Sequence, residues 1–137
     1  MLVSDQRVLE LKGNCRFCAE LGNRKFLDTG QVLGIWDAFP VSPGHALLIP
    51  HRHVATWFDA TIEEQQELVA AIEKAKTAIE LEHSPDGYNI GINSGKAAGQ
   101  TVPHLHVHVI PRYEGDVNDP RGGVRWIIPD RATYWEE

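Results

Sequence analysis

Three histidines alternate with apolar residues in the run PHLHVHVIPR, and no other feature of the chain constrains its folding as strongly. His104, His106 and His108 are separated by Leu105 and Val107. A period of two is the period of a β-strand, so this histidine run predicts a strand with its imidazoles on one face and its apolar residues buried on the other. Histidine is a poor strand former that titrates near neutrality, so packing does not account for three of them on one surface. The run therefore predicts a functional site.

The size and composition of the chain are those of one globular domain. It has 137 residues, of which 42% are hydrophobic and 23% are charged, so a core of ordinary size is expected. A formal net charge of −6 argues against a dedicated binder of duplex DNA or RNA. No apolar run approaches the length that spans a membrane, and the first residues, MLVSDQRVLELKG, lack the pattern of a signal peptide. We therefore expect a single domain over residues 1–137, without duplex nucleic acid or a membrane as a partner.

The two cysteines, Cys15 and Cys18, lie close together in the run NCRFCAE. This count excludes a disulfide framework and favours a reducing compartment, so a cytoplasmic location is expected. Cys-x-x-Cys is also the spacing of a zinc knuckle, in which two histidines would complete a closed, structural Cys₂His₂ site. A redox pair is a weaker interpretation, because no helix of a thioredoxin-like unit follows the cysteines. The remaining interpretation is two buried free cysteines.

The rest of the chain predicts several strands and one long helix. A helix is expected to begin after Thr61, since Thr61 and Glu64 have the spacing of a capping box, and to continue to about His83. The strands are expected at residues 25–29, 31–39, 45–50, 88–93 and 105–111. The buried stripe of the helix is expected to include Ile62, Leu68, Val69, Ile72, Ala75 and Ile79.

This order of elements predicts an α+β fold with a mainly antiparallel sheet of about five strands. The single long helix is expected to cover one face of the sheet. Polar residues on the other face would then form the floor of a cleft. The tail, residues 113–137, is rich in glycine, proline and aspartate until VRWIIP, which is expected to add a short strand or to lie across the surface.

Six of the seven histidines lie in two segments, because His45, His51 and His53 gather in PGHALLIPHRH. Along a strand, neighbouring histidines of the run would be about 6.6 Å apart, and the whole run would span about 13 Å. Zinc–nitrogen bonds of about 2.0–2.1 Å cannot draw both ends of such a run onto one ion. His104 and His106 could share a metal, but the whole run could not. One end of the run is therefore expected to bind metal, and the rest to carry out chemistry.

The segment GQTVPHLHVHVIPR resembles the signature of the histidine-triad superfamily, His-φ-His-φ-His-φ-φ with φ apolar. PGHALLIPHRHV is similar to a second segment of that family, Pro-x-His-x-hydrophobic-Ile-Pro-x-x-His, and Asn93 lies before the glycine loop as it does there. The resemblance covers about residues 15–112 and leaves 113–137 as a variable tail. The Cys-x-x-Cys pair resembles that of small bacterial, zinc-binding members. A two-fold dimer is also implied.

The resemblance implies a reaction and a metal site. Members of the family are nucleotide hydrolases and transferases that cleave at the α-phosphorus of nucleoside 5′-phosphate derivatives. His106 matches the family's nucleophile, which forms a covalent nucleotidyl-histidine that water later displaces. His108 and His45 match positions that contact the phosphate. In zinc-bearing members the matching ligands are Cys15, Cys18, His53 and His104.

Further matches imply contacts to the substrate. Asp37 matches an acidic residue that accepts from the ribose hydroxyls, the other interpretation being an ordinary turn acid. Asn93 matches a phosphate contact, although it could instead satisfy loop backbone. Gly99, Gln100 and Thr101 match the loop that holds the phosphates and faces the leaving group. The candidates for a base pocket, which core packing explains at least as well, are Trp36, Phe26, Leu27 and Ile35.

The sequence thus predicts a hydrolase of purine nucleotides with a structural zinc and no organic cofactor. Transferase members of the family carry glutamine at the third position of the run, whereas this chain has His108, which favours hydrolysis. Dinucleoside polyphosphates and nucleoside phosphoramidates are both candidate substrates. The alternative is a nucleotide-binding interaction module whose turnover is incidental.

Overall fold

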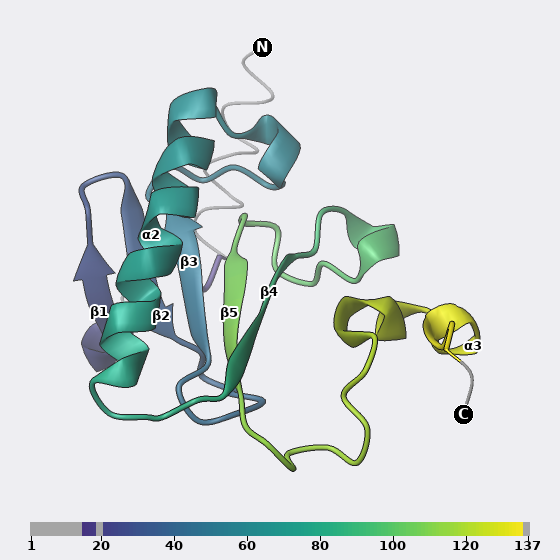
Figure 1. The fold of residues 1–137 in the computed structure, drawn as a ribbon. Helices are drawn as coiled ribbons and strands as arrows, with labels where there is room; N and C mark the ends of the chain where they lie inside the picture. Colours follow the sequence, from purple (N-terminus) through teal and green to yellow (C-terminus); the bar gives the residue numbers. More distant parts are fainter. Residues whose placement is uncertain (1–14, 19–20, 136–137) are drawn as a thin grey trace.

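The computed structural model describes residues 15–18 and 21–135, and its centre is one antiparallel sheet (Figure 1). The five strands lie in the order β1-β2-β3-β5-β4, and every neighbouring pair is antiparallel. Their bounds are β1 Lys25–Asp28, β2 Val32–Trp36, β3 Ala46–Pro50, β4 Gly87–Ile92 and β5 Val107–Arg112. The predicted fold class is confirmed. Because β5 lies between β3 and β4, the last strand occupies the interior of the sheet and β4 lies at its edge.

The long helix α2, Ile62–Glu80, packs across one face of this sheet (Figure 1). The predicted capping box is present: the Thr61 side chain accepts from the Glu64 N–H, and the Glu64 side chain accepts from the Thr61 N–H. The predicted buried stripe was wrong at two positions, because Ile62 and Val69 are 68% and 58% exposed. Ile62 occupies the first turn, and Val69 lies at the side of α2 that borders the sheet edge. The buried residues of α2 are Leu68, Ala71, Ala75 and Ile79.

The two faces of the sheet carry two different cores. On the α2 face, the helix packs against side chains that include Val32, Leu48, Val107 and Val109. The opposite face is covered near β2 and β3 by the segment that holds the two cysteines. The buried residues of this second core are Cys15, Phe17, Ile35, Leu47 and Ile49. Every residue of β3 is therefore buried, since both of its faces are covered.

The remaining elements are short. Three 3₁₀ turns, η1 Gly22–Arg24, η2 Trp57–Asp59 and η3 Lys96–Ala98, connect the strands and the helix. Within the described residues no helix is both long and apolar enough to cross a membrane.

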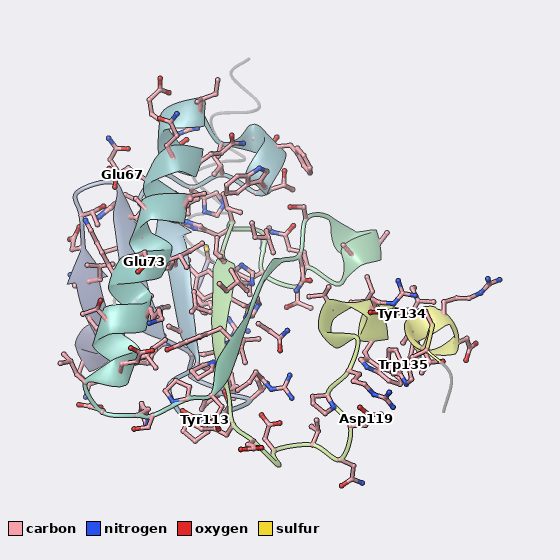
Figure 2. All side chains as sticks on the ribbon, in the orientation of Figure 1. Glu67, Glu73, Tyr113, Asp119, Tyr134 and Trp135 are labelled. Atoms are coloured by element: carbon pink, nitrogen blue, oxygen red, sulfur yellow. The ribbon has the colours of Figure 1, made fainter. Side chains whose placement is uncertain are left out.

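The tail does not add a strand to the sheet. After β5 it extends beyond the β4 edge and forms η4, Gly123–Ile127, and the short helix α3, Pro129–Ala132 (Figure 1). Figure 2 shows Tyr134 and Trp135 together at the far end of this tail, where Arg121 lies over the Trp135 ring. Of the two alternatives expected for VRWIIP, the short strand is wrong: Gly122 and Gly123 have positive φ angles, and this backbone starts a helical turn instead of an extended pairing.

Candidate active site and metal centre

The strand formed by the histidine run begins at a later residue than the alternation predicts. Strand β5 begins at Val107, so His108 lies in the strand while His104 and His106 precede it. The expected strand start at Leu105 was wrong, because the Leu105 N–H donates to the Val54 carbonyl at 2.7 Å, beyond the end of β3. This irregular entry buries His104 and His106, which are only 1% and 7% exposed.

His106 is held in a single tautomer. Its Nδ1 lies 2.8 Å from the His104 carbonyl oxygen, which can only accept, so Nδ1 carries the proton and Nε2 keeps its lone pair. Burial lowers the pKa of His106, opposed by the hydrogen bond to His104 and by Asp37, and the positive charge of Arg16 lowers it further. The Phe17 ring packs edge-on against the imidazole, with ring centroids 5.0 Å apart. The result is a neutral, oriented imidazole with a free nucleophilic nitrogen.

A second chain of hydrogen bonds fixes His45 and His108. The Val41 N–H donates to His45 Nδ1 at 3.1 Å, so in neutral His45 the proton is on Nε2. That Nε2–H donates to His108 Nδ1 at 2.9 Å, which leaves the His108 proton on Nε2. Burial lowers the pKa of His108 to about 4, and the charges that His106 and His45 would carry act in the same direction. His108 is therefore a neutral donor at neutral pH.

The same chain argues against a metal ion at His45, His108 and Asp37. One ligand atom from each of the three residues lies within 4.8 Å of the others. A metal on His45 Nε2 would require the proton to move to Nδ1, where it would face the N–H of Val41. The hydrogen bonds through His45 bring these groups together, and Asp37 Oδ2 lies 3.4 Å from His45 Nε2.

His106 and His108 line a cavity of about 250 Å³, together with Asp37, Asn93, Gly99 and Thr101 from the predicted set. His45 lies behind His108 and is 3% exposed. The other residues of the wall are Arg16, Phe17, Arg24, Ala38, Leu47 and Val102.

Two of the predicted loop contacts are already engaged with the protein itself. Gln100 donates to the carbonyls of Ala55 and Val102 and accepts from the Gly95 N–H, so its side chain braces the loop and does not line the cavity. The Gly99 N–H donates to the Lys96 carbonyl at 3.0 Å. The loop presents Thr101 and the Gly99 backbone to the cavity instead.

The aromatic and apolar candidates for a base pocket belong to the core. Phe26 stacks on Trp36 with ring centroids 4.1 Å apart, and both pack with Leu27 against the α2-side core. Ile35 is fully buried on the opposite face. None of the four lines the cavity. Sequence patterns missed Arg16, Phe17 and Arg24; the first two carry a signal, since residues between zinc-knuckle cysteines must lie beside the metal ligands.

The four residues matched to zinc ligands form a cluster next to the cavity. His53 Nδ1 and His104 Nδ1 are 3.1 Å apart, and Cys18 Sγ lies 3.0 Å and 3.4 Å from them. Cys15 Sγ is 3.5 Å from His104 Nδ1. All four ligand atoms lie within 4.8 Å of one another.

This geometry and donor set fit a tetrahedral zinc ion. Zinc–nitrogen bonds of about 2.0–2.1 Å and zinc–sulfur bonds of about 2.3 Å place tetrahedral ligand atoms about 3.3–3.8 Å apart. His104 Nε2 lies 2.9 Å from the Pro50 carbonyl oxygen and must donate to it, so His104 Nδ1 presents its lone pair to the thiols. Two thiols and two imidazoles are the donors of a closed structural site.

Known proteins match most of the chain. The family model described as the HIT domain matches residues 19–115. The AP-4-A phosphorylase of Mycobacterium tuberculosis (strain CDC 1551 / Oshkosh) is 41% identical over 88 residues, which are 64% of this chain and 45% of that protein. The asymmetrical bis(5′-nucleosyl)-tetraphosphatase of Schizosaccharomyces pombe is 39% identical over 99 residues, which are 72% of this chain and 54% of that protein. The chain thus spans about half the length of these two relatives.

A solved structure agrees with the fold, and its name describes it as zinc-bound. The zinc-bound histidine triad family protein of Mycobacterium smegmatis is 37% identical and superposes with a TM-score of 0.68, covering 79% of this chain and 81% of that one. The family match includes the histidine run, the sheet and the helix, and it extends over more than half of the 137 residues. On this basis the chain belongs to the histidine-triad, or HIT, family.

Proposed function

We propose that this chain is a nucleotide hydrolase that cleaves at the α-phosphorus of nucleoside 5′-phosphate derivatives through a covalent nucleotidyl-histidine. The observation that carries the proposal is the buried, neutral His106, with Nδ1 bonded to a backbone carbonyl and Nε2 free at a cavity. The names of its relatives, a bis(5′-nucleosyl)-tetraphosphatase and an AP-4-A phosphorylase, support chemistry on dinucleoside polyphosphates.

The first step forms a bond between His106 Nε2 and the α-phosphorus while the bond from phosphorus to the leaving group breaks. The leaving group departs with the bonding electron pair and takes a proton from water. The hydrogen bond from Nδ1 to the His104 carbonyl stabilises the positive imidazole ring of the adduct. Water then attacks phosphorus and releases a proton to the solvent, the electron pair of the phosphorus–nitrogen bond returns to Nε2, and a nucleoside monophosphate leaves with His106 restored.

The neighbouring residues stabilise and orient this reaction. His108 donates its Nε2–H to a non-bridging phosphate oxygen, and His45 keeps that proton in place by donating to His108 Nδ1. Asp37 accepts from the ribose hydroxyls, while Asn93 and Thr101 contact the phosphates from the β4–β5 side. Because the last of the three histidines is His108 and not glutamine, water is the expected acceptor.

We also propose that Cys15, Cys18, His53 and His104 bind a structural zinc ion. The cluster's tetrahedral spacing and the zinc-bound relative from Mycobacterium smegmatis support this assignment. When bound, zinc would cross-link the segment that carries the cysteines to the start of the histidine run. Thiol ligands of a zinc ion are retained in a reducing compartment, so the proposed site also supports a cytoplasmic location.

The open edge of the sheet supports a homodimer. Strand β4 is an edge strand, and Ile90 and Ile92 on it are 44% and 37% exposed. With Val69 and Ile72 of α2 they line an apolar cavity of about 170 Å³ between the helix and the edge. We propose that a second copy of the chain covers this surface around a two-fold axis, since edge strands with apolar neighbours pair readily.

Trapping the intermediate tests the hydrolase. His106→Asn is expected to keep the fold and nucleotide binding but to lose several orders of magnitude in turnover, because no other imidazole can take the covalent role. The wild type, quenched in alkaline denaturant during turnover, should carry a nucleotidyl group on His106 by mass spectrometry. His51→Asn is the matched control and should turn over normally, since His51 lies on the surface and pairs with Asp28.

The outcomes separate an enzyme from a binding module. Near-wild-type turnover in His106→Asn would exclude His106 as the nucleophile. Tight nucleotide binding with neither turnover nor a trapped adduct in the wild type would favour the alternative, an interaction module with incidental turnover.

A further inference from the structure

The cavity has two chemically different ends, which the strand order separates. His108 on the interior strand β5 lies between them. Asn93, Gly99 and Thr101 approach from the β4 side, in the loop between β4 and β5. The end on the β1–β2–β3 side is formed by Phe17, Arg24, Asp37, Ala38 and Leu47, with Arg16.

The β1–β2–β3 end combines apolar walls with hydrogen-bond donors. Phe17, Ala38 and Leu47 suit the faces of a flat base, and in the proposed function Asp37 holds the ribose beside them. The other polar side chains of this end are Arg16 and Arg24, whose guanidinium groups donate and cannot accept. A base bound here therefore meets donors along its edge.

Arg24 is the better placed of the two arginines to contact a base. It ends the turn η1 directly before β1, is half-buried, and donates from Nη1 to the Trp36 carbonyl at 3.3 Å. Among the residues that the structure describes it forms no ion pair, so most of its donors are available to a ligand. Arg16 is exposed, and its charge acts on His106, where the phosphate is expected.

Purine bases differ in what they present to such a donor. The N7 edge of guanine carries two acceptors, O6 and N7, which match the fork of an arginine. The same edge of adenine carries the N7 acceptor and the N6 amino donor, which would face a second donor. We propose that Arg24 recognises the O6/N7 edge of guanine, so that guanosine nucleotides are the preferred substrates. This inference rests on the proposed function and names its substrate class.

Calorimetric binding of GMP and AMP tests this preference without turnover. The wild type is expected to bind GMP about 5- to 100-fold more tightly than AMP, the range for one bidentate contact to a base. Arg24→Gln should reverse the order, because an amide side chain donates to N7 and accepts from the N6 amino group of adenine. Arg24→Lys keeps the charge without the fork and should reduce the preference to near unity.

The controls distinguish a base contact from a phosphate contact. Arg52→Gln changes an exposed arginine that pairs with Glu64 and should leave both affinities unchanged. Equal binding of GMP and AMP to the wild type would overturn the inference. So would an equal loss of both nucleotides in Arg24→Gln together with normal binding in Arg24→Lys, which is the behaviour of a charge contact. If Arg24→Gln has a clearly lower Tm than the wild type, the GMP and AMP affinities of Arg24→Lys alone test the inference.

Turnover separates this inference from the proposed hydrolase. Hydrolysis of diguanosine and diadenosine tetraphosphates at equal kcat/KM would contradict guanine recognition and leave the hydrolase in place. A GMP preference that depends on Arg24, without hydrolysis of either compound, would support base recognition and contradict the hydrolase.

Discussion

Two backbone groups determine the protonation of the cavity histidines. The His104 carbonyl requires a proton on His106 Nδ1, and the Val41 N–H requires a lone pair on His45 Nδ1. Because the His45 Nε2–H donates to His108 Nδ1, the second constraint also places the His108 proton on Nε2. Neither constraint depends on a charged partner, so a neutral nucleophile and a neutral donor can coexist in one buried site.

Acid should destabilise the protein through His108. Its pKa is about 4 in the fold, against an ordinary value of 6.5. Between these values the unfolded chain binds more protons than the folded one, so stability falls as the pH drops from 6.5 towards 4 and is constant above 6.5. Because His108 is only partly buried, solvent screening keeps its loss below the ~3 kcal/mol that the full shift would give. Urea unfolding of the wild type and of His108→Gln at pH 7.5, 5.5 and 4.5 measures it, and the variant should depend less on pH.

The comparison between the two proteins measures the effect of His108 together with its electrostatic coupling to His45 and His106. Groups that do not interact with His108 are the same in both proteins and cancel in the difference. Parallel pH dependences for the wild type and His108→Gln would contradict the burial argument.

At the scale of elements, the short segment of residues 15–18 links the proposed metal centre to the candidate active site. Phe17 packs edge-on against both His104 and His106, with ring centroids 6.0 Å and 5.0 Å away. Arg16 and Phe17, which lie between the two cysteines in the sequence, line the cavity. The proposed zinc ion would therefore hold one wall of the candidate active site, and the backbone carbonyl of its ligand His104 would orient His106.

Removing one thiol should lower zinc content and stability together. Cys15→Ser is expected to reduce bound zinc well below one ion per chain and to lower Tm, because metal binding is coupled to folding. Elemental analysis and thermal unfolding measure the two effects, and a chelator should reproduce them in the wild type. His51→Asn, which changes a histidine outside the cluster, should keep its zinc. If the wild type reaches its full thermal stability without bound metal, the zinc assignment is wrong and the cysteines are core residues.

The sequence predicts elements better than it predicts where they end. The spacing of hydrophobic residues along the sequence predicted all five strands and α2, because each buried face repeats with the period of its element. The start of β5 was misplaced by two residues, since the Leu105 N–H finds its acceptor at Val54, 51 positions away in the chain. Val69 was assigned to the core because periodicity does not show that β4 ends the sheet beside it.

The candidate site was predictable only where a motif fixes the chemistry. The histidine run and the cysteine pair, together with the family resemblance that they carry, predicted the metal cluster and half of the residues that line the cavity. Arg24 carries no pattern in the sequence, because its position depends on the turn before β1 and on the Trp36 carbonyl. Gln100 matches a binding motif, yet its hydrogen bonds hold the loop together, which only the folded backbone reveals.

At the scale of the whole molecule, charge and surface are distributed unevenly. The chain has a formal net charge of −6, while Arg16 and Arg24 concentrate positive charge at the cavity. An anionic substrate is thus attracted locally by a protein that repels anions at a distance. Figure 2 shows Glu73 on the outer side of α2, which is one of the exposed acidic positions far from the cavity. Exposed apolar side chains include Ile90 and Ile92 at the edge formed by β4.

That edge makes a prediction about assembly. Ile90→Lys places a charge on the exposed edge strand, next to the apolar cavity that it shares with Val69 and Ile72. If a second copy covers this surface, burying an unpaired lysine there is costly, and the dimer should dissociate. Light scattering after size exclusion should then give twice the 15.3 kDa chain mass for the wild type and the single-chain mass for the variant.

A matched substitution shows whether the effect belongs to the edge. Leu81→Lys changes a leucine that is 81% exposed and follows the last turn of α2, outside the edge cavity, so it should leave the dimer intact. Because the cavity histidines lie on the opposite face of the sheet from the α2-side core, the Ile90→Lys monomer should still bind GMP. A monomeric wild type, or a dimer that survives Ile90→Lys and dissociates in Leu81→Lys, would place the contact between copies elsewhere on the molecule.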